Sequence, residues 1–279
     1  MDQAGLSAPG RYAVIGHPVA HSRSPWIHAQ FAAQTGERIE YGALLAPLDG
    51  FASTLAAFRT GGGKGANVTL PFKAEAFALS ESRSARAEAA GAVNTLDLCG
   101  DGIRGDNTDG CGLVRDLAHN LGFSVAGRRV LLLGAGGAAR GELLPLLEEC
   151  PADLVVVNRS VDKARALVAA LAGRVPGPLA VCGYDELAGE RFDLVINATS
   201  AGLSDAPLPL PPRLYSPGSL AYDMVYGKET AFMRTARSGG AARVADGLGM
   251  LVEQAAESFF VWRGVRPATG PVLAALRAA

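Results

Sequence analysis

A glycine-rich turn between an apolar run and a helical pattern constrains this chain more than any other segment. Residues 130–133 read Val-Leu-Leu-Leu, and Gly134-Ala135-Gly136-Gly137-Ala138-Ala139 follows directly. This is the G-x-G-x-x-A form of a dinucleotide-binding fingerprint: the first glycine allows a tight turn, the second admits a pyrophosphate, and the alanine keeps helix and strand close. Free N–H groups at the helix start favour a phosphate there. The predicted cofactor-binding residues of the turn are Gly134, Ala135, Gly136, Gly137 and Ala138.

The residues that end the next apolar run indicate which dinucleotide binds. Residues 154–157 read as a second strand, and Asn158, Arg159 and Ser160 follow it. An NAD site usually has an acidic residue about 20 residues after the turn, to hold the ribose 2′-hydroxyl. A carboxylate would repel a 2′-phosphate, whereas a guanidinium and a hydroxyl bind one. Because one Arg–phosphate bond of about 1.5–3 kcal/mol would give roughly ten- to hundredfold preference, we predict NADP. Lys163 stands one turn later, and Arg165 is interpreted as a solvated helix residue.

Bulk composition limits the class of partner. The chain has 279 residues, of which 49% are hydrophobic and 19% charged, with a formal net charge of −1. That length favours two domains, and the near-neutral charge argues against nucleic acid or a membrane surface as partner. No run of 18 apolar residues and no secretory signal pattern is found, so no membrane span is expected. A small-molecule substrate is the expected partner, and the oligomeric state stays open between monomer and homodimer.

The cysteines and histidines show no metal-ligand spacing. The four cysteines are irregularly spaced without a C-x-x-C pair, and we expect them to be buried free thiols of a cytoplasmic protein. The four histidines show neither H-E-x-x-H nor a Cys/His ligand pattern, so no metal site is predicted. No G-x-S-x-G occurs, which leaves a serine hydrolase unsupported.

Short β-rich runs alternate with helical patterns along the chain, which predicts an α/β protein with largely parallel sheets. In the first third, the expected strands are residues 12–15, 39–44, 66–70 and 94–98, and the expected helices are residues 25–34, 51–59 and 72–78. A helix over 113–121 precedes the glycine turn, and further strands are expected at 179–182, 194–197, 220–223 and 243–245. The last two helical patterns, 250–261 and 271–277, continue no alternation, so we expect them to return to the first domain.

Four polar clusters stand where apolar strands of the first domain are expected to end. They are residues 21–25, 67–73, 90–95 and 105–110. Taken singly, each has an ordinary structural explanation: Ser22 and Ser24 can cap a helix, Asp109 can make a turn, and Lys73 can be a solvated helix lysine. Strand ends that face a nucleotide domain are, however, where an α/β substrate pocket normally lies. The four clusters together therefore favour a shared pocket.

In this order, the motifs resemble the shikimate dehydrogenase family over almost the whole length. The matching segments are residues 16–25, 67–73, 91–95, 105–110, 134–139, 158–160, 197–202, 222–226 and 246–254. Each motif alone is moderately specific, whereas the ordered set is very specific. The domains implied are 1–108 for substrate binding and catalysis, 109–247 for a Rossmann-like, doubly wound NADP-binding domain, and 248–279 for C-terminal helices that pack on the first.

The resemblance implies reversible reduction of 3-dehydroshikimate to shikimate with NADPH, a step toward the aromatic amino acids. By motif position, Lys73 and Asp109 would be the catalytic pair. The implied substrate-binding residues are Ser22 and Ser24 for the carboxylate, with Thr69, Lys73, Asn94, Asp109, Tyr226 and Gln254 for the ring hydroxyls and ketone. The implied cofactor-binding residues outside the glycine turn are Asn158, Arg159, Ser160, Lys163, Thr199, Met224 and Gly247.

Three other functions stay open at this point. The chain could instead be a member of a related group that prefers quinate or uses NAD, since one or two pocket contacts would decide between shikimate and quinate. Another could act on an amino-substituted shikimate analogue. From a different class, the chain could be a non-catalytic sensor of NADP or shikimate. A sensor would not need the proton-transfer pair, so the presence of both Lys73 and Asp109 favours an enzyme over a sensor.

Overall fold

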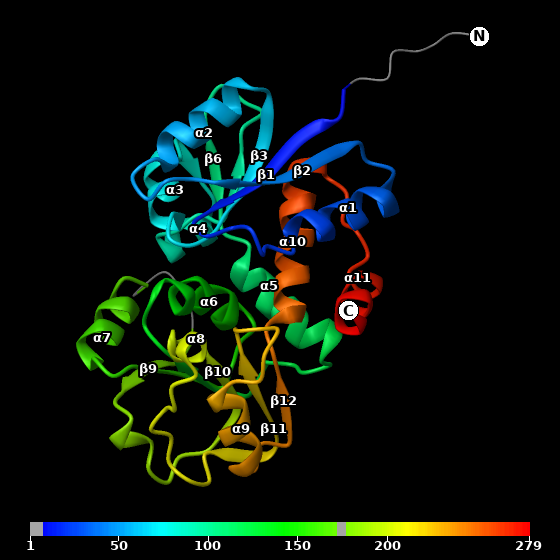
Figure 1. Cartoon of the computed structure of the whole chain (residues 1–279). Helices are drawn as coiled ribbons and strands as arrows, with labels where there is room; N and C mark the ends of the chain where they lie inside the picture. The colour runs from blue at the N-terminus through cyan, green and yellow to red at the C-terminus, as the bar shows by residue number, and fades with distance from the viewer. Residues whose placement is uncertain (1–7, 172–176) are drawn as a thin grey trace. The chain divides into compact units, whose positions relative to one another are not determined.

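The structure, a computed structural model, describes residues 8–171 and 177–279. The chain divides into two compact units, which we call unit 1 (Met1–Thr108 with Gln254–Ala279) and unit 2 (Asp109–Glu253). Each unit is built on one six-stranded sheet with helices against it (Figure 1). The predicted two-domain α/β architecture is confirmed, and the chain after Gln254 returns to unit 1.

The sheet of unit 2 is parallel throughout and has the strand order β12-β11-β10-β7-β8-β9. Its strands are β7 Arg129–Leu133, β8 Asp153–Val157, β9 Leu179–Cys182, β10 Phe192–Asn197, β11 Tyr215–Asp223 and β12 Arg243–Ala245. Its helices are α5 Asp109–Arg115 with a π-helical turn at Asp116–Asn120, α6 Gly137–Glu148, α7 Val161–Ala169, a 3-10 turn at Asp185–Leu187, α8 Ala201–Ser204 and α9 Ala231–Ser238. Read from β7 outward, this is the doubly wound order of a Rossmann fold, whose direction reverses between β7 and β10.

Apolar residues on both faces of the strands explain why this sheet is parallel and buried. Leu131 and Leu133 of β7 pack in one cluster with Phe232 and Met233 of α9, while their neighbour Leu132 is fully buried on the opposite face. Figure 1 shows α6 and α9 on opposite sides of the sheet. Continuous apolar strands covered by helices on both faces are typical of parallel sheets.

The sheet of unit 1 has the order β2-β1-β3-β5-β6-β4 and is mixed, because β5 runs antiparallel to both neighbours. Its strands are β1 Gly10–Gly16, β2 Ile39–Leu45, β3 Gly63–Val68, β4 Ser82–Arg83, β5 Thr95–Asp97 and β6 Arg104–Asp106. Its helices are α1 Ser24–Thr35, α2 Phe51–Thr60, α3 Lys73–Leu79, α4 Ala85–Ala90 and α11 Gly270–Ala278, together with the part of α10 (Leu248–Arg263) that follows Glu253.

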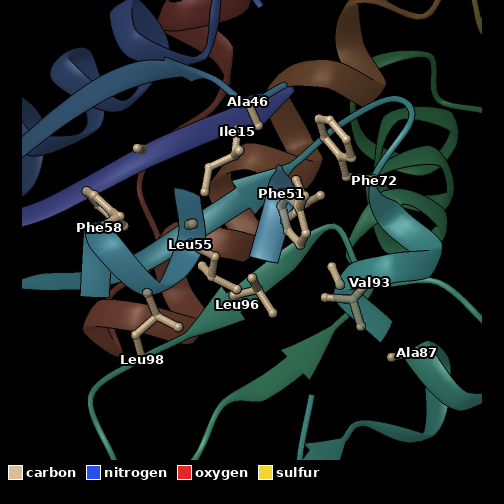
Figure 2. Close-up of a cluster of buried hydrophobic side chains, with 14 residues drawn as sticks. Ile15, Ala46, Phe51, Leu55, Phe58, Phe72, Ala87, Val93, Leu96 and Leu98 are labelled. Carbon is tan, nitrogen blue, oxygen red and sulfur yellow. The ribbon is translucent and has the colours of Figure 1, made fainter. Parts of the chain in front are cut away.

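The two faces of this sheet are packed by different kinds of side chain. On one face, Phe51 and Leu55 of α2 lie in an aliphatic and aromatic cluster with Ile15 and Leu96 of the strands (Figure 2). On the other face, aromatic rings of α1 and α10 pack against β1 and β2; the ring centroids of Tyr12 and Trp262, for example, are 4.8 Å apart. The return of α10 therefore completes the core of unit 1.

Three local expectations from the sequence need correction. Strand β3 begins at Gly63 rather than at residue 66. Its first residues give no strand signal, because two of them must be glycine to fit under aromatic rings: a Cβ at Gly63 or Gly65 would lie 2.4–2.5 Å from the ring of Phe58 or Trp262. The helix expected at 113–121 begins at Asp109 and changes to a π-helical turn at Asp116. All four cysteines are free, but none is buried: Cys111 and Cys182 are partly exposed, and Cys99 and Cys150 are exposed because both follow the end of an element.

Candidate functional site

In unit 2, the glycine turn lies at the carboxyl end of β7, next to the point where the strand order reverses. Gly134 has φ +112°, a conformation that only glycine adopts without strain, and a Cβ there would meet the Ala198 carbonyl oxygen at 3.1 Å. A Cβ at Gly136 or Gly137 would meet nothing within 4 Å. The turn therefore leaves open space at the start of α6, where free N–H groups favour a phosphate.

The loops that follow β10, β11 and β12 pack beside one another. The carboxamide oxygen of Asn197 accepts hydrogen bonds from the backbone N–H and the hydroxyl of Thr199 (3.1 and 2.7 Å), and its Nδ2 donates to Asp223 (3.1 Å). After β12, Gly247 comes so near Met224 that a Cβ would lie 2.2 Å from the Met224 carbonyl oxygen. The predicted residues Thr199, Met224 and Gly247 thus follow strand ends on the same edge of one parallel sheet.

The polar tip after β8 stands on this same edge. Asn158 folds back on its own turn, with Nδ2 donating to the Ser160 carbonyl (2.9 Å), and α7 begins one residue later. The side chains of Arg159 and Lys163 are exposed. Arg165 lies further along α7, pairs with Asp162 at 3.1 Å and is largely exposed. The structure therefore presents two cations and a hydroxyl where a 2′-phosphate is expected, and directs Arg165 to a surface ion pair.

In unit 1, the loops after β1 and β3 are joined by backbone hydrogen bonds. The His17 N–H donates to the Leu70 carbonyl, and the Thr69 N–H donates to the Ile15 carbonyl, both at 3.0 Å. The Gly16 Cα approaches the Thr69 side chain so closely that a Cβ would lie 2.3 Å from its methyl group. The chain continues from β1 to Ser22, whose hydroxyl accepts from the Ser24 N–H at 3.3 Å at the start of α1.

Lys73 and Asn94 lie at neighbouring strand ends of unit 1. Lys73 is the first residue of α3, and its carbonyl accepts a hydrogen bond from the Val93 N–H at 2.9 Å. The next residue, Asn94, has its carboxamide oxygen hydrogen-bonded by the backbone N–H of Thr108 at 2.8 Å. Asp109 follows Thr108 directly and opens α5 in unit 2.

A buried polar network surrounds Asn94. Its Nδ2 donates to the Thr108 hydroxyl at 2.9 Å and lies 3.4 Å from Oε1 of Gln254, which belongs to α10. The carboxamide of Asn67 and the hydroxyls of Thr95 and Ser258 complete the network. The structure therefore brings together the predicted residues Asn94 and Gln254 and adds partners that sequence reasoning missed. The helical pattern did not single out Ser258, because Glu253 and Glu257 of the same helix are polar as well.

An ion-pair cluster supports the same region. Arg86 of α4 makes two hydrogen bonds of 2.7 Å to the carboxylate of Asp106, whose carbonyl accepts from the Asn94 N–H. Burial by itself would raise the pKa of Asp106, but the guanidinium of Arg86 and the Ser84 hydroxyl lower it below its ordinary value. Arg86 also pairs with Glu257 of α10 at 2.9 Å. The carboxylate thus remains charged and anchors the strand end that carries Asn94.

The predicted site residues are divided between the units. Ser22, Ser24, Thr69, Lys73, Asn94 and Gln254 belong to unit 1, whereas Asp109, Tyr226 and all the predicted cofactor-binding residues belong to unit 2. Tyr226, in the loop after β11, is 38% exposed. Among residues 8–171 and 177–279, no group of three or more His, Cys, Asp or Glu could hold a metal ion. No helix within these ranges is long and apolar enough to span a membrane.

Models of protein families match the chain in three consecutive segments. Residues 14–96 match the shikimate dehydrogenase substrate binding domain, residues 116–204 match shikimate / quinate 5-dehydrogenase, and residues 247–277 match the shikimate 5'-dehydrogenase C-terminal domain. The matched segments run from the last residues of β1 into β5, include the glycine turn with the tip after β8, and include α10 and most of α11.

Individual proteins and solved structures agree with these matches. A shikimate dehydrogenase (NADP(+)) of Dechloromonas aromatica is 62% identical over 268 residues, covering 96% of this chain and 97% of that protein. A crystal structure of an Ael1 enzyme from Pseudomonas putida superposes with a TM-score of 0.91 at 49% identity, covering 96% and 98% of the two chains. The shikimate 5-dehydrogenase of Thermus thermophilus, in complex with NADP(H) and shikimate, gives 0.84 at 34% identity, covering 96% and 99%.

Proposed function

This chain belongs to the shikimate dehydrogenase family, and from that membership we propose that it reduces 3-dehydroshikimate reversibly to shikimate with NADPH. It is an NADP-dependent oxidoreductase of aromatic amino acid biosynthesis. The observation that carries this function is the 62% identity, over nearly the full length, with a curated NADP(+)-dependent enzyme. The fold adds a parallel sheet with a glycine turn at its reversal point, which is where such folds bind dinucleotides.

The residues of unit 2 fit NADP. Gly136 and Gly137 leave open space at the start of the 12-residue helix α6. In a turn that bound no ligand, larger side chains could fill this space. Gly134 to Ala138 would hold the pyrophosphate, while Asn158, Arg159, Ser160 and Lys163 would hold the 2′-phosphate. Thr199, Met224 and Gly247 would line the adenosine or nicotinamide region. When bound, the cofactor supplies the hydride for ketone reduction.

Lys73 and Asp109 form the catalytic pair in this proposal. Ketone reduction places a hydride on carbon and needs a proton for the oxygen, so an ammonium group that donates to the developing alkoxide stabilises the transition state. Lys73 supplies that proton at Nζ, and in the reverse direction it accepts the proton of the substrate hydroxyl. Asp109 orients the ammonium group and accepts from a substrate hydroxyl. Support comes from the anchoring of Val93 to Lys73 and of Asn94 to Thr108, which fixes the backbone beside both residues.

The remaining substrate groups are assigned to the strand ends of unit 1. Ser22 and Ser24 hold the carboxylate, and Thr69, Asn94 and Gln254, together with Tyr226 of unit 2, hold the ring hydroxyls. The backbone bonds between the loops after β1 and β3 support this assignment, because they bring the serine segment and Thr69 to one edge of the sheet. We further propose that the enzyme acts in the cytoplasm, as a monomer or homodimer, without nucleic acid or membrane as partner.

A four-way rate comparison tests this function. Initial rates of nicotinamide reduction are measured with shikimate and with quinate, each with NADP⁺ and with NAD⁺. We expect shikimate with NADP⁺ to have the highest kcat/KM, by at least about tenfold over NAD⁺, because of the Arg159 fork. Tight binding of both ligands without any change at the nicotinamide absorbance band would contradict the proposed function and indicate a sensor instead.

A further inference from the structure

Ser258 is the centre of the buried polar network in unit 1. It is fully buried on α10, one turn after Gln254, and its hydroxyl donates to the Gln254 backbone carbonyl at 3.0 Å. The same oxygen lies 2.9 Å from Nδ2 of Asn67 and 2.8 Å from the Thr95 hydroxyl. The Thr108 hydroxyl is 3.2 Å away. One side chain therefore connects α10 to β3, to β5 and to the residue that precedes Asp109.

Two backbone groups fix the direction of the hydrogen bonds in this network. The Asn94 carbonyl can only accept, so the atom of Asn67 that lies 3.1 Å from it must be the Nδ2 amide. The Thr108 N–H can only donate, so the atom of Asn94 that lies 2.8 Å from it must be Oδ1. Neither carboxamide can rotate by 180° without placing like groups together. The NH₂ group of Asn94 is therefore held toward the Gln254 side chain.

The far end of the network is held by stacked rings. The Tyr41 hydroxyl donates to Oδ1 of Asn67 at 2.7 Å, which satisfies the side of that carboxamide turned away from Ser258. The Tyr41 ring stacks on His28, with centroids 4.1 Å apart and planes 6° from parallel. Because stacking restricts the Tyr41 ring, the hydroxyl that orients Asn67 is itself held in place.

We propose that Ser258 is a positioning residue for the substrate: through Thr95, Thr108 and its own helix, it sets the orientation of the Asn94 and Gln254 carboxamides. It is not a catalytic residue, since it is fully buried. Loss of its hydroxyl removes one hydrogen-bond partner each from Asn67 and Thr95 and frees α10 to shift against β5. Misplaced carboxamides then bind the ring hydroxyls less well. This inference rests on the proposed function, which assigns Asn94 and Gln254 to substrate binding.

The test compares Ser258→Ala with Ser219→Ala in the full chain. Ser219 is equally buried but lies in unit 2, and its hydroxyl has no hydrogen-bond partner within the part of the chain that the structure describes. We expect Ser258→Ala to raise the KM for shikimate about 5- to 30-fold, equivalent to one or two lost buried hydrogen bonds, and to change the KM for NADP⁺ less than about twofold. Ser219→Ala should change neither constant by more than about twofold.

A double-mutant cycle separates positioning from packing. If Ser258 acts through Asn94, Ser258→Ala should add much less to the shikimate KM in an Asn94→Ala background than in the wild type. Ser258→Cys leaves no cavity and weakens the hydrogen bonds, so it serves the same test if the alanine variant does not fold. A lower melting temperature with an unchanged shikimate KM would overturn the inference alone. A wild-type chain that does not oxidise shikimate would overturn the proposed function and this inference with it.

Discussion

The sheet of unit 2 is parallel throughout, and its buried Asn197 and Asp223 bond to the loops that follow their strands. The sheet of unit 1 reverses direction at β5, and its buried polar strand residues bond instead to helix α10. In unit 2, Leu131 to Leu133 are fully buried, and the groups expected to bind NADP lie in loops beyond the strand ends. In unit 1, Asn67 and Thr95 belong to strands and are at most 6% exposed. We therefore expect substitutions at the exposed tip after β8 to change cofactor preference alone, and substitutions in the network of unit 1 to couple ligand binding to packing.

The largest effect is expected at Lys73. Replacing it by alanine removes the proton donor, so kcat should fall roughly 10²–10⁴-fold, as is usual for a lost general acid or base. The KM for shikimate should change little, because the carboxylate and most hydroxyl contacts remain. Steady-state rates of shikimate oxidation measure both constants. Full activity in Lys73→Ala would remove the catalytic assignment.

An intermediate effect is expected at Arg159, with Arg165 as the matched control on the following helix. Arg159→Ala should lower kcat/KM for NADP⁺ roughly ten- to hundredfold and leave that for NAD⁺ nearly unchanged, because only NADP⁺ carries the 2′-phosphate. Arg165→Ala breaks an exposed ion pair with Asp162, which contributes little, and should leave the preference intact. Equal losses in the two variants, or equal losses for the two cofactors, would contradict the proposed phosphate site.

An effect on stability rather than on rate, a pH dependence of unfolding, is expected from the interior of unit 1. Burial lowers the pKa of His28 to about 3, below its ordinary value of 6.5. The unfolded chain then binds a proton that the folded chain excludes, so the free energy of unfolding should fall as the pH drops from about 6.5 toward 3, by up to about 1.4 kcal/mol per pH unit.

Denaturant unfolding between pH 7 and pH 4 measures this slope. His28→Phe keeps an aromatic ring in the stack and removes the titrating group, so its unfolding free energy should depend less on pH than that of the wild type. Identical slopes would mean that His28 does not carry the dependence.

The fold could be predicted further than the site could. The strand at 130–133, the glycine turn and the strand at 154–157 were recognisable because their signals are local: apolar runs and a glycine whose φ of +112° no other residue adopts freely. The early start of β3 was missed, because Gly63 and Gly65 resemble turn residues until the rings of Phe58 and Trp262 are placed over them.

The network around Ser258 was beyond sequence reasoning for a related reason. Its hydrogen bond from Asn67 joins residues 191 positions apart, and no periodicity along the chain marks such a pair. The polar motifs at Asn94 and Gln254 could be recognised by resemblance, but their orientation depends on backbone groups of other segments. The proposed convergence of Lys73 and Asp109 remains a prediction.

The most direct test of the division between the units is a crossed kinetic comparison of Ser258→Ala and Arg159→Ala, with KM measured for both shikimate and NADP⁺ in each. The account predicts that Ser258→Ala raises only the shikimate KM, and that Arg159→Ala raises only the NADP⁺ KM. A rise in both constants in both variants, or a rise in the opposite constant in either one, would contradict it.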